Sequence, residues 1–144
     1  MLINITLGIF LVICCITDIK FREINPKVLA VFALAGAVLF MICQPVSIFE
    51  EAIGLLIGIV FIALWAVTDE KVGLGDGLMM LVTGIYLGGR ENSFLIMTAM
   101  LLSAVYSIYF LVIKKADRNM KFPFAPFILT AFVLRQALDL WRFV

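Results

Sequence analysis

Histidine is absent from this 144-residue chain, and its absence excludes several kinds of catalytic site. A serine protease of the Ser-His type would lack its general base, and a zinc protease with an HExxH motif would lack its metal ligands. A cysteine nucleophile would lack its usual histidine partner, and Cys14 and Cys15 lie inside an apolar run. The acid–base chemistry that remains open to this chain is therefore carboxylate chemistry.

Cysteine and charge are also scarce. The three cysteines form neither a CxxC metal motif nor a disulfide framework, so we interpret them as small apolar packing residues. Charged residues make up 15 % of the chain and the net charge is +1, which leaves no clustered basic face for phosphate groups. We expect no nucleic-acid partner, and nothing in the sequence indicates a metal or a cofactor.

Apolar residues, in contrast, make up 65 % of the chain, and the mean hydropathy is +1.18. Soluble domains contain roughly 45–50 % apolar residues, and the core of one soluble domain could not bury this excess. The first apolar run lacks the basic segment and the small residues before Cys14 that a cleaved leader would have, so we treat it as a retained span. Residues 1–144 are predicted to form a single membrane-embedded domain.

Six apolar runs follow one another, separated by short charged or proline-containing segments. Each run approaches the ~17–25 residues of a transmembrane helix. The alternating pattern of a membrane barrel is absent, and helices satisfy their own backbone groups in hydrocarbon. The sequence predicts an all-α, polytopic membrane protein with six transmembrane helices, at residues 2–17, 27–43, 51–67, 72–88, 93–113 and 124–140.

Lysine and arginine fall mainly in alternate connections between these runs. The connections on the other side contain Glu50, Glu51 and the single basic residue Arg90. The positive-inside bias then predicts a cytoplasmic location for the basic connections and an outside location for both termini. Arg135 and Arg142 depart from this bias near the C-terminus. The basic connections hold Lys20, Arg22, Lys27, Lys71, Lys114, Lys115, Arg118 and Lys121.

Asp76 is the most informative carboxylate. A fourth helix that spans the bilayer must begin near Val72, which places Asp76 about one turn below the surface. A carboxylate at that depth is costly and indicates a functional site by default. Glycines at 73, 75 and 77 let backbone or substrate approach it closely. The alternative is a glycine-rich turn in which Asp76 is a helix N-cap.

Asp18 closes the first run, on the same predicted membrane face. It could be an interfacial charge paired with Lys20 or Arg22, or the second member of a carboxylate pair. Two adjacent carboxyls share one proton, so the ionised group can activate water while the protonated one polarises a peptide carbonyl. Because such groups titrate together, the sequence leaves the identity of the base open. Asp69 and Glu70 could take the place of Asp76 if the fourth helix began later. The other acids expected in hydrated loops are Glu50, Glu51, Glu91 and Asp117.

Three segments resemble known membrane proteases. Gly73-Leu74-Gly75-Asp76 matches the GxGD signature of membrane aspartic proteases. The segment 18–26 is similar to the first-aspartate segment of type IV prepilin peptidases, where Asp is followed after five residues by Ile-Pro-Asn; here Ile24 is followed by Asn-Pro. The segment 123–126, Pro-Phe-Ala-Pro, resembles a late Pro-Phe-x-Pro stretch of that family. One departure is Leu78, where the family often has lysine.

This resemblance implies an aspartic endopeptidase that removes the basic leader from prepilin-like precursors, with Asp18 and Asp76 as the catalytic pair. It would act at the cytoplasmic face of the inner membrane of a prokaryote, where membrane lipid surrounds it. The short first cytoplasmic loop holds no cysteine, so we expect peptidase activity without methyltransferase activity. The alternatives are a cation- or proton-coupled transporter that uses the same aspartates, and a catalytically silent assembly partner. Residues expected to bind substrate or shape the site are Gly73, Gly75, Gly77, Pro123 and Pro126.

Overall fold

The computed structural model describes residues 2–43, 47–68, 73–112 and 122–141, which are helical with short connections and contain no strand. The all-helical class is therefore confirmed. Four helices, α1 to α4, are long and apolar enough to cross a membrane, so the chain is a multi-pass membrane protein, and the count of six spans stays a prediction. The helices are α1 (Leu2–Phe21), α2 (Pro26–Cys43), α3 (Ile48–Val67), α4 (Leu74–Val112) and α5 (Ala125–Trp141).

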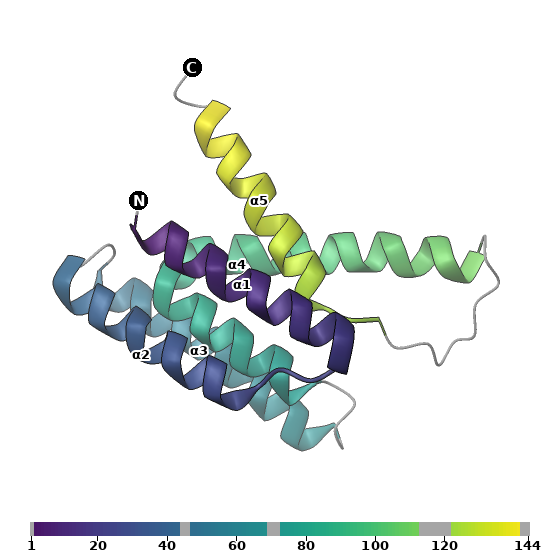
Figure 1. The fold of residues 1–144 in the computed structure, drawn as a ribbon, viewed down its shortest axis with the longest axis horizontal. Coiled ribbons are helices and arrows are strands. Elements are labelled where there is room, and N and C mark those ends of the chain that lie inside the picture. Colours follow the sequence, from purple (N-terminus) through teal and green to yellow (C-terminus); the bar gives the residue numbers. More distant parts are fainter. Residues whose placement is uncertain (1, 44–46, 69–72, 113–121, 142–144) are drawn as a thin grey trace.

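Helices α1, α2, α3 and the first half of α4 form a bundle (Figure 1). The second half of α4 turns back along this bundle and extends beyond it, and α5 crosses over α1 and α4 with its C-terminal end pointing away. The buried core lies mainly where α1, α4 and α5 meet, and it includes Leu7, Phe10, Met79, Leu95 and Ile128.

The predicted spans 72–88 and 93–113 are joined in the single helix α4, which is interrupted at Gly88. This residue has φ 71° and ψ −179°, a combination that is essentially restricted to glycine. Side chains beyond the break fold back onto the first half of the helix. The Asn92 Oδ1 atom accepts a hydrogen bond of 2.8 Å from the Thr83 hydroxyl, and its Nδ2 donates to the Met80 carbonyl at 3.2 Å.

These contacts require the chain to reverse direction. In a straight helix, residues 80 and 92 would be roughly 18 Å apart at 1.5 Å per residue. Gly88 therefore acts as the corner between two helical segments that correspond to the two predicted spans. The expectation that Arg90 and Glu91 lie in a loop was wrong, because both residues are helical.

The interface between α3 and α4 depends on close backbone contact. Gly54 and Gly58 lie one turn apart on the buried face of α3. A Cβ atom at Gly54 would lie 2.8 Å from the Gly84 carbonyl oxygen, and one at Gly58 would overlap the backbone of Leu81. This arrangement is the small-residue packing typical of membrane helices, where a glycine pair at i and i+4 brings two backbones together.

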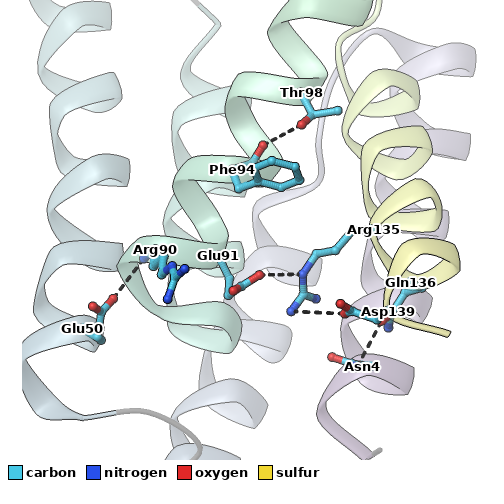
Figure 2. Close-up of polar contacts among 9 residues, drawn as sticks. All are labelled: Asn4, Glu50, Arg90, Glu91, Phe94, Thr98, Arg135, Gln136 and Asp139. Atoms are coloured by element: carbon cyan, nitrogen blue, oxygen red, sulfur yellow. Dashed lines mark hydrogen bonds and ion pairs between the residues drawn. The ribbon is translucent and has the colours of Figure 1, made fainter. Parts of the chain in front are cut away.

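The end of the bundle opposite Asp18 is joined by polar contacts (Figure 2). The Arg135 Nε atom of α5 donates to the Glu91 Oε2 atom at 2.9 Å, and Arg135 Nη2 lies 4.0 Å from Asp139 Oδ2. Asn4 donates to Gln136 at 3.4 Å. Arg135, which departs from the positive-inside bias, is thus neutralised by acidic neighbours on α4 and α5.

Two acids that were expected in a hydrated loop lie instead in the first turn of α3. The Glu50 Oε2 atom accepts a hydrogen bond of 3.0 Å from the Arg90 backbone N–H (Figure 2). Glu51 is 8 % exposed, and its Oε2 atom has no hydrogen-bond partner within the described part of the chain. The prediction that Glu51 lies in a hydrated loop was therefore wrong. Asp117 and the basic group Lys114, Lys115, Arg118 and Lys121 lie outside the described residues, as do Lys71 and Arg142.

Candidate active site

Asp18 lies in the last turn of α1 with its side chain buried. The residue is 8 % exposed, although the residues on either side of it, Thr17 and Ile19, are partly or fully exposed. Its Oδ2 atom accepts a hydrogen bond from the backbone N–H of Ala125, with a donor–acceptor distance of 3.0 Å, and Ala125 has no exposed surface. Asp18 thus joins the end of α1 to the beginning of α5, across 107 positions of sequence.

The Pro-Phe-Ala-Pro segment presents this N–H group. The Phe124 carbonyl accepts hydrogen bonds from the N–H groups of Phe127 at 3.0 Å and Ile128 at 3.4 Å. Pro126 has no N–H group to donate. Among residues 125–128, Ala125 therefore carries the one N–H for which α5 itself offers no acceptor, and Asp18 supplies the acceptor.

Asp76 lies in the first turn of α4 and is half-buried. The Gly73 carbonyl accepts hydrogen bonds from the N–H groups of Asp76 at 3.1 Å and Gly77 at 3.3 Å, so Gly73 occupies the N-cap position. The alternative in which Asp76 is the N-cap was wrong. A Cβ atom at Gly73 would lie 2.8 Å from Asp76 Oδ2, which means that the carboxyl folds back over this glycine.

The other two glycines of the segment face neighbouring elements. A Cβ atom at Gly75 would meet the Ile24 side chain at 3.4 Å, and one at Gly77 would lie 3.1 Å from the Ile62 backbone nitrogen of α3. Gly77 therefore permits close packing of α4 on α3. Gly75 brings the beginning of α4 against the loop that follows α1.

The two aspartates come from the same end of the bundle, where α1 ends and α4 begins (Figure 1). Ile24 lies six residues after Asp18, and its side chain is placed beside Gly75, the residue that precedes Asp76, at the distance where a Cβ atom on Gly75 would be in van der Waals contact with it. The carboxyls of Asp18 and Asp76 are close enough to interact electrostatically. The fold thus gathers the three resembling segments at one end of the molecule, and the catalytic roles of the two aspartates stay a prediction.

The basic residues nearest to Asp18 in sequence do not pair with it. Lys20 and Arg22 are exposed, and the ion pairs found among the described residues are those of Arg135. Arg22 has φ 54° and ends α1, with its backbone N–H bonded to the Asp18 carbonyl at 2.9 Å. Asp69 and Glu70, the predicted substitutes for Asp76, lie outside the described residues.

The arrangement suits carboxylate chemistry. Within the ranges that the structure describes, no three His, Cys, Asp or Glu side chains are grouped so that they could hold a metal ion. Two carboxyls held near each other in a partly buried site cannot both carry a full charge at low cost, so they favour a state with one shared proton. Such a pair can activate a water molecule and polarise a carbonyl group.

Several residues that hold the site, or the helices that carry it, were not predicted from the sequence. The backbone N–H of Ala125 has no side-chain signal, although the proline that follows it was noted. The glycine pair Gly54 and Gly58 forms a GxxxG pattern that the sequence does carry. Thr83 lies in an apolar run and Asn92 directly before one, and buried polar residues of this kind commonly mark contacts between membrane helices.

Comparison with known proteins gives one family. The model of the type IV leader peptidase family matches residues 5–108, which include α2, α3 and most of α1 and α4. The matched range contains both aspartates and the glycines around Asp76. No curated protein and no solved structure matches the chain.

Proposed function

The chain belongs to the type IV leader peptidase family, and we propose that it is a membrane aspartic endopeptidase that removes the basic leader from prepilin-like precursors. The catalytic pair in this proposal is Asp18 and Asp76. What supports it is that Asp18, in the last turn of α1, and Asp76, in the first turn of α4, lie at the same end of the helical bundle, with Asp18 bonded to the first turn of α5.

The proposed reaction is addition of water to a peptide carbonyl. The ionised aspartate removes a proton from water, and the resulting hydroxide attacks the carbonyl carbon while the protonated aspartate donates to the carbonyl oxygen. The C–N bond then breaks, and a proton passes to the leaving amine. No further reactant is needed, because hydrolysis consumes only water.

The membrane setting supports a substrate with a charged segment next to an apolar helix. Asp18 ends one apolar helix and Asp76 begins another, so the pair lies near the boundary between hydrocarbon and headgroups. A basic leader would remain in water on the cytoplasmic side, while the apolar helix of the precursor would enter the bilayer beside the enzyme. The scissile junction between them would then meet the carboxyl pair.

We further propose the full arrangement of six spans, with α4 divided at Gly88 and α5 as the last span. Both termini would lie outside and the carboxyl pair at the cytoplasmic face of a prokaryotic inner membrane. The bias of lysine and arginine in the sequence supports this orientation. Gly73, Gly75, Gly77, Pro123 and Pro126 would shape the site through the contacts described above.

The decisive experiment uses the purified full chain in liposomes with a membrane-inserted, prepilin-like peptide. Asp18→Asn and Asp76→Asn should each lower the cleavage rate by about 10²–10⁴-fold, since each removes one acid–base group from the reaction. Glu23→Gln is the matched control, because Glu23 is an exposed carboxylate in the loop after α1. This control should cleave at the rate of the unchanged protein.

Cleavage that survives both aspartate substitutions would reject the proposal. A transporter would instead show ion flux into the same liposomes that requires the aspartates and does not depend on the peptide. Measuring flux and cleavage on one preparation therefore separates the two classes of protein.

A further inference from the structure

We propose that the first turn of α5 holds the negative charge of the carboxyl pair on Asp18, so that Asp18 is the general base and Asp76 carries the shared proton. This inference rests on the proposed function and deepens it, because the two aspartates are otherwise equivalent candidates. It makes the Ala125 backbone a positioning group for the reaction.

One hydrogen bond distinguishes the two carboxyls. Asp18 Oδ2 accepts from the Ala125 N–H at 3.0 Å, and both residues are buried. An amide N–H can only donate, and its bond to a carboxylate is stronger than its bond to a neutral carboxyl. Because this donor is shielded from water, its preference for the charged form of Asp18 is not weakened by solvent.

Asp76 has no corresponding donor among the residues that the structure describes. The first-turn N–H groups of Asp76 and Gly77 are directed to the Gly73 carbonyl instead. Its carboxyl lies against Gly73, which has no side chain that could donate to it. When one of two interacting carboxyls must keep a proton, the one without a donor is the less costly place for it.

Helix dipoles also act on the pair. The C-terminal end of α1 disfavours a charge on Asp18, whereas the N-terminal end of α5, which Asp18 contacts, favours it. These two effects oppose each other. The N-terminal end of α4 favours a charge on Asp76, but a dipole at a half-exposed helix end is a weaker influence than a direct bond from a buried donor.

The remaining titratable groups near Asp18 do not reverse this assignment. On α1, the thiols of Cys14 and Cys15 interact with Asp18, and thiols are uncharged at neutral pH. Asp76 is the interacting group from α4. The residues of α5 that begin the helix are Ala-Pro-Phe-Ile, and Lys20 and Arg22 point to the exposed surface.

With Asp18 as the base, each proton transfer in the hydrolysis has a defined donor and acceptor. Asp18 takes a proton from water, the hydroxide forms a bond to the carbonyl carbon, and the proton on Asp76 passes to the carbonyl oxygen. Asp18 is then protonated and Asp76 ionised. When the C–N bond of the tetrahedral intermediate breaks, Asp18 gives its proton to the leaving amine and Asp76 takes a proton from a hydroxyl of the intermediate, which restores both carboxyls.

The test removes the donor and leaves both aspartates in place. Ala125→Pro deletes the N–H at a helix position that tolerates proline. In the plot of kcat/KM against pH, the acidic limb reports protonation of the general base. Loss of the N–H donor should move this limb to higher pH by about one unit, while the basic limb stays in place. The matched control is Ile48→Pro, which puts proline at the first position of α3, at the other end of the bundle, and should leave both limbs unchanged.

A shift of the basic limb alone in Ala125→Pro would overturn the assignment, because it would place the shared proton on Asp18. A second measurement does not depend on this variant. Carboxyl carbons of ¹³C-labelled aspartate in the unchanged protein are assigned by their loss in Asp18→Asn and Asp76→Asn, and their titration is followed by NMR. The Asp18 carbon should titrate at the lower pH, and the opposite order would refute the inference.

Failure of the proposed function would appear differently. In that case both asparagine variants would still cleave the peptide, whatever order the two carboxyls titrate in. If both variants lose cleavage and Asp76 titrates at the lower pH, the protease assignment stands and only the choice of base is wrong.

Discussion

At the scale of single residues, Asp18 has two tasks that can be separated. It is a candidate catalytic group, and it is the hydrogen-bond acceptor for the buried N–H at the beginning of α5. A buried N–H group that loses its acceptor destabilises the folded state, because it gave up a hydrogen bond to water on folding and no longer has one in the protein. A substitution at this position can therefore alter activity, stability or both, depending on whether it keeps an acceptor.

We expect Asp18→Asn to fold normally, because the Asn Oδ1 atom can accept from the Ala125 N–H. Asp18→Ala removes the acceptor and should lower the free energy of unfolding by about 1–3 kcal/mol relative to Asp18→Asn. Denaturant unfolding of both variants in the same detergent measures this difference. Equal stabilities would show that the hydrogen bond contributes nothing to the fold.

At the scale of elements, α4 is the helix on which the architecture depends. Its first half carries Asp76 and packs closely on α3 through Gly54 and Gly58. Its second half contacts α5, whose first residue donates to Asp18. The corner at Gly88 therefore sets how the first half of α4, which carries Asp76, is placed relative to α5, which donates to Asp18.

Gly88→Ala should destabilise the protein by about 1–3 kcal/mol, because φ 71° with ψ −179° is strained for any residue with a Cβ atom. Cleavage should fall as well, since a changed corner would displace α5 from Asp18. Gly8→Ala is the matched control, because a Cβ atom there meets only the Phe132 ring at an ordinary 3.5 Å. Thermal unfolding and the cleavage rate of the two variants check this expectation, and a Gly88→Ala protein as stable as the control would contradict it.

At the scale of the whole molecule, the two ends of the bundle differ in chemistry. One end gathers Asp18, Asp76 and the beginning of α5, and the other is joined by ion pairs and hydrogen bonds around Arg135. Cys43 is exposed and lies at the end of α2 that is opposite to the aspartates, whereas Cys14 is buried. The chain therefore carries a natural thiol that reports its orientation in the membrane.

If the carboxyl pair faces the cytoplasm, a membrane-impermeant maleimide added to intact spheroplasts should label Cys43 from outside. Labelling should disappear in Cys43→Ser, which serves as the control for the other two thiols. Labelling of Cys43 only in inverted vesicles would reverse the proposed orientation and place the pair at the outer face.

The sequence by itself determined the helical class, the membrane setting and the limits of most helices, because these depend on runs of apolar residues and their length. The absence of histidine and the predicted depth of Asp76 also narrowed the chemistry to carboxylates. The departures arose where side chains meet across the fold. Glu51 was expected in water and is buried, and Arg90 and Glu91 were expected in a loop and are helical.

Only the tertiary structure decided how Asp18 is held. Every residue except proline has a backbone N–H group, so residue type does not show which one donates to a side chain. The partner of the Ala125 N–H lies 107 residues away, so no local pattern could predict its bond to Asp18. The same holds for the corner at Gly88, where a glycine among many takes a conformation that depends on the packing of Asn92 against the preceding helical segment. Local composition determines which segments enter the membrane, whereas the contacts between those segments determine what they bring together.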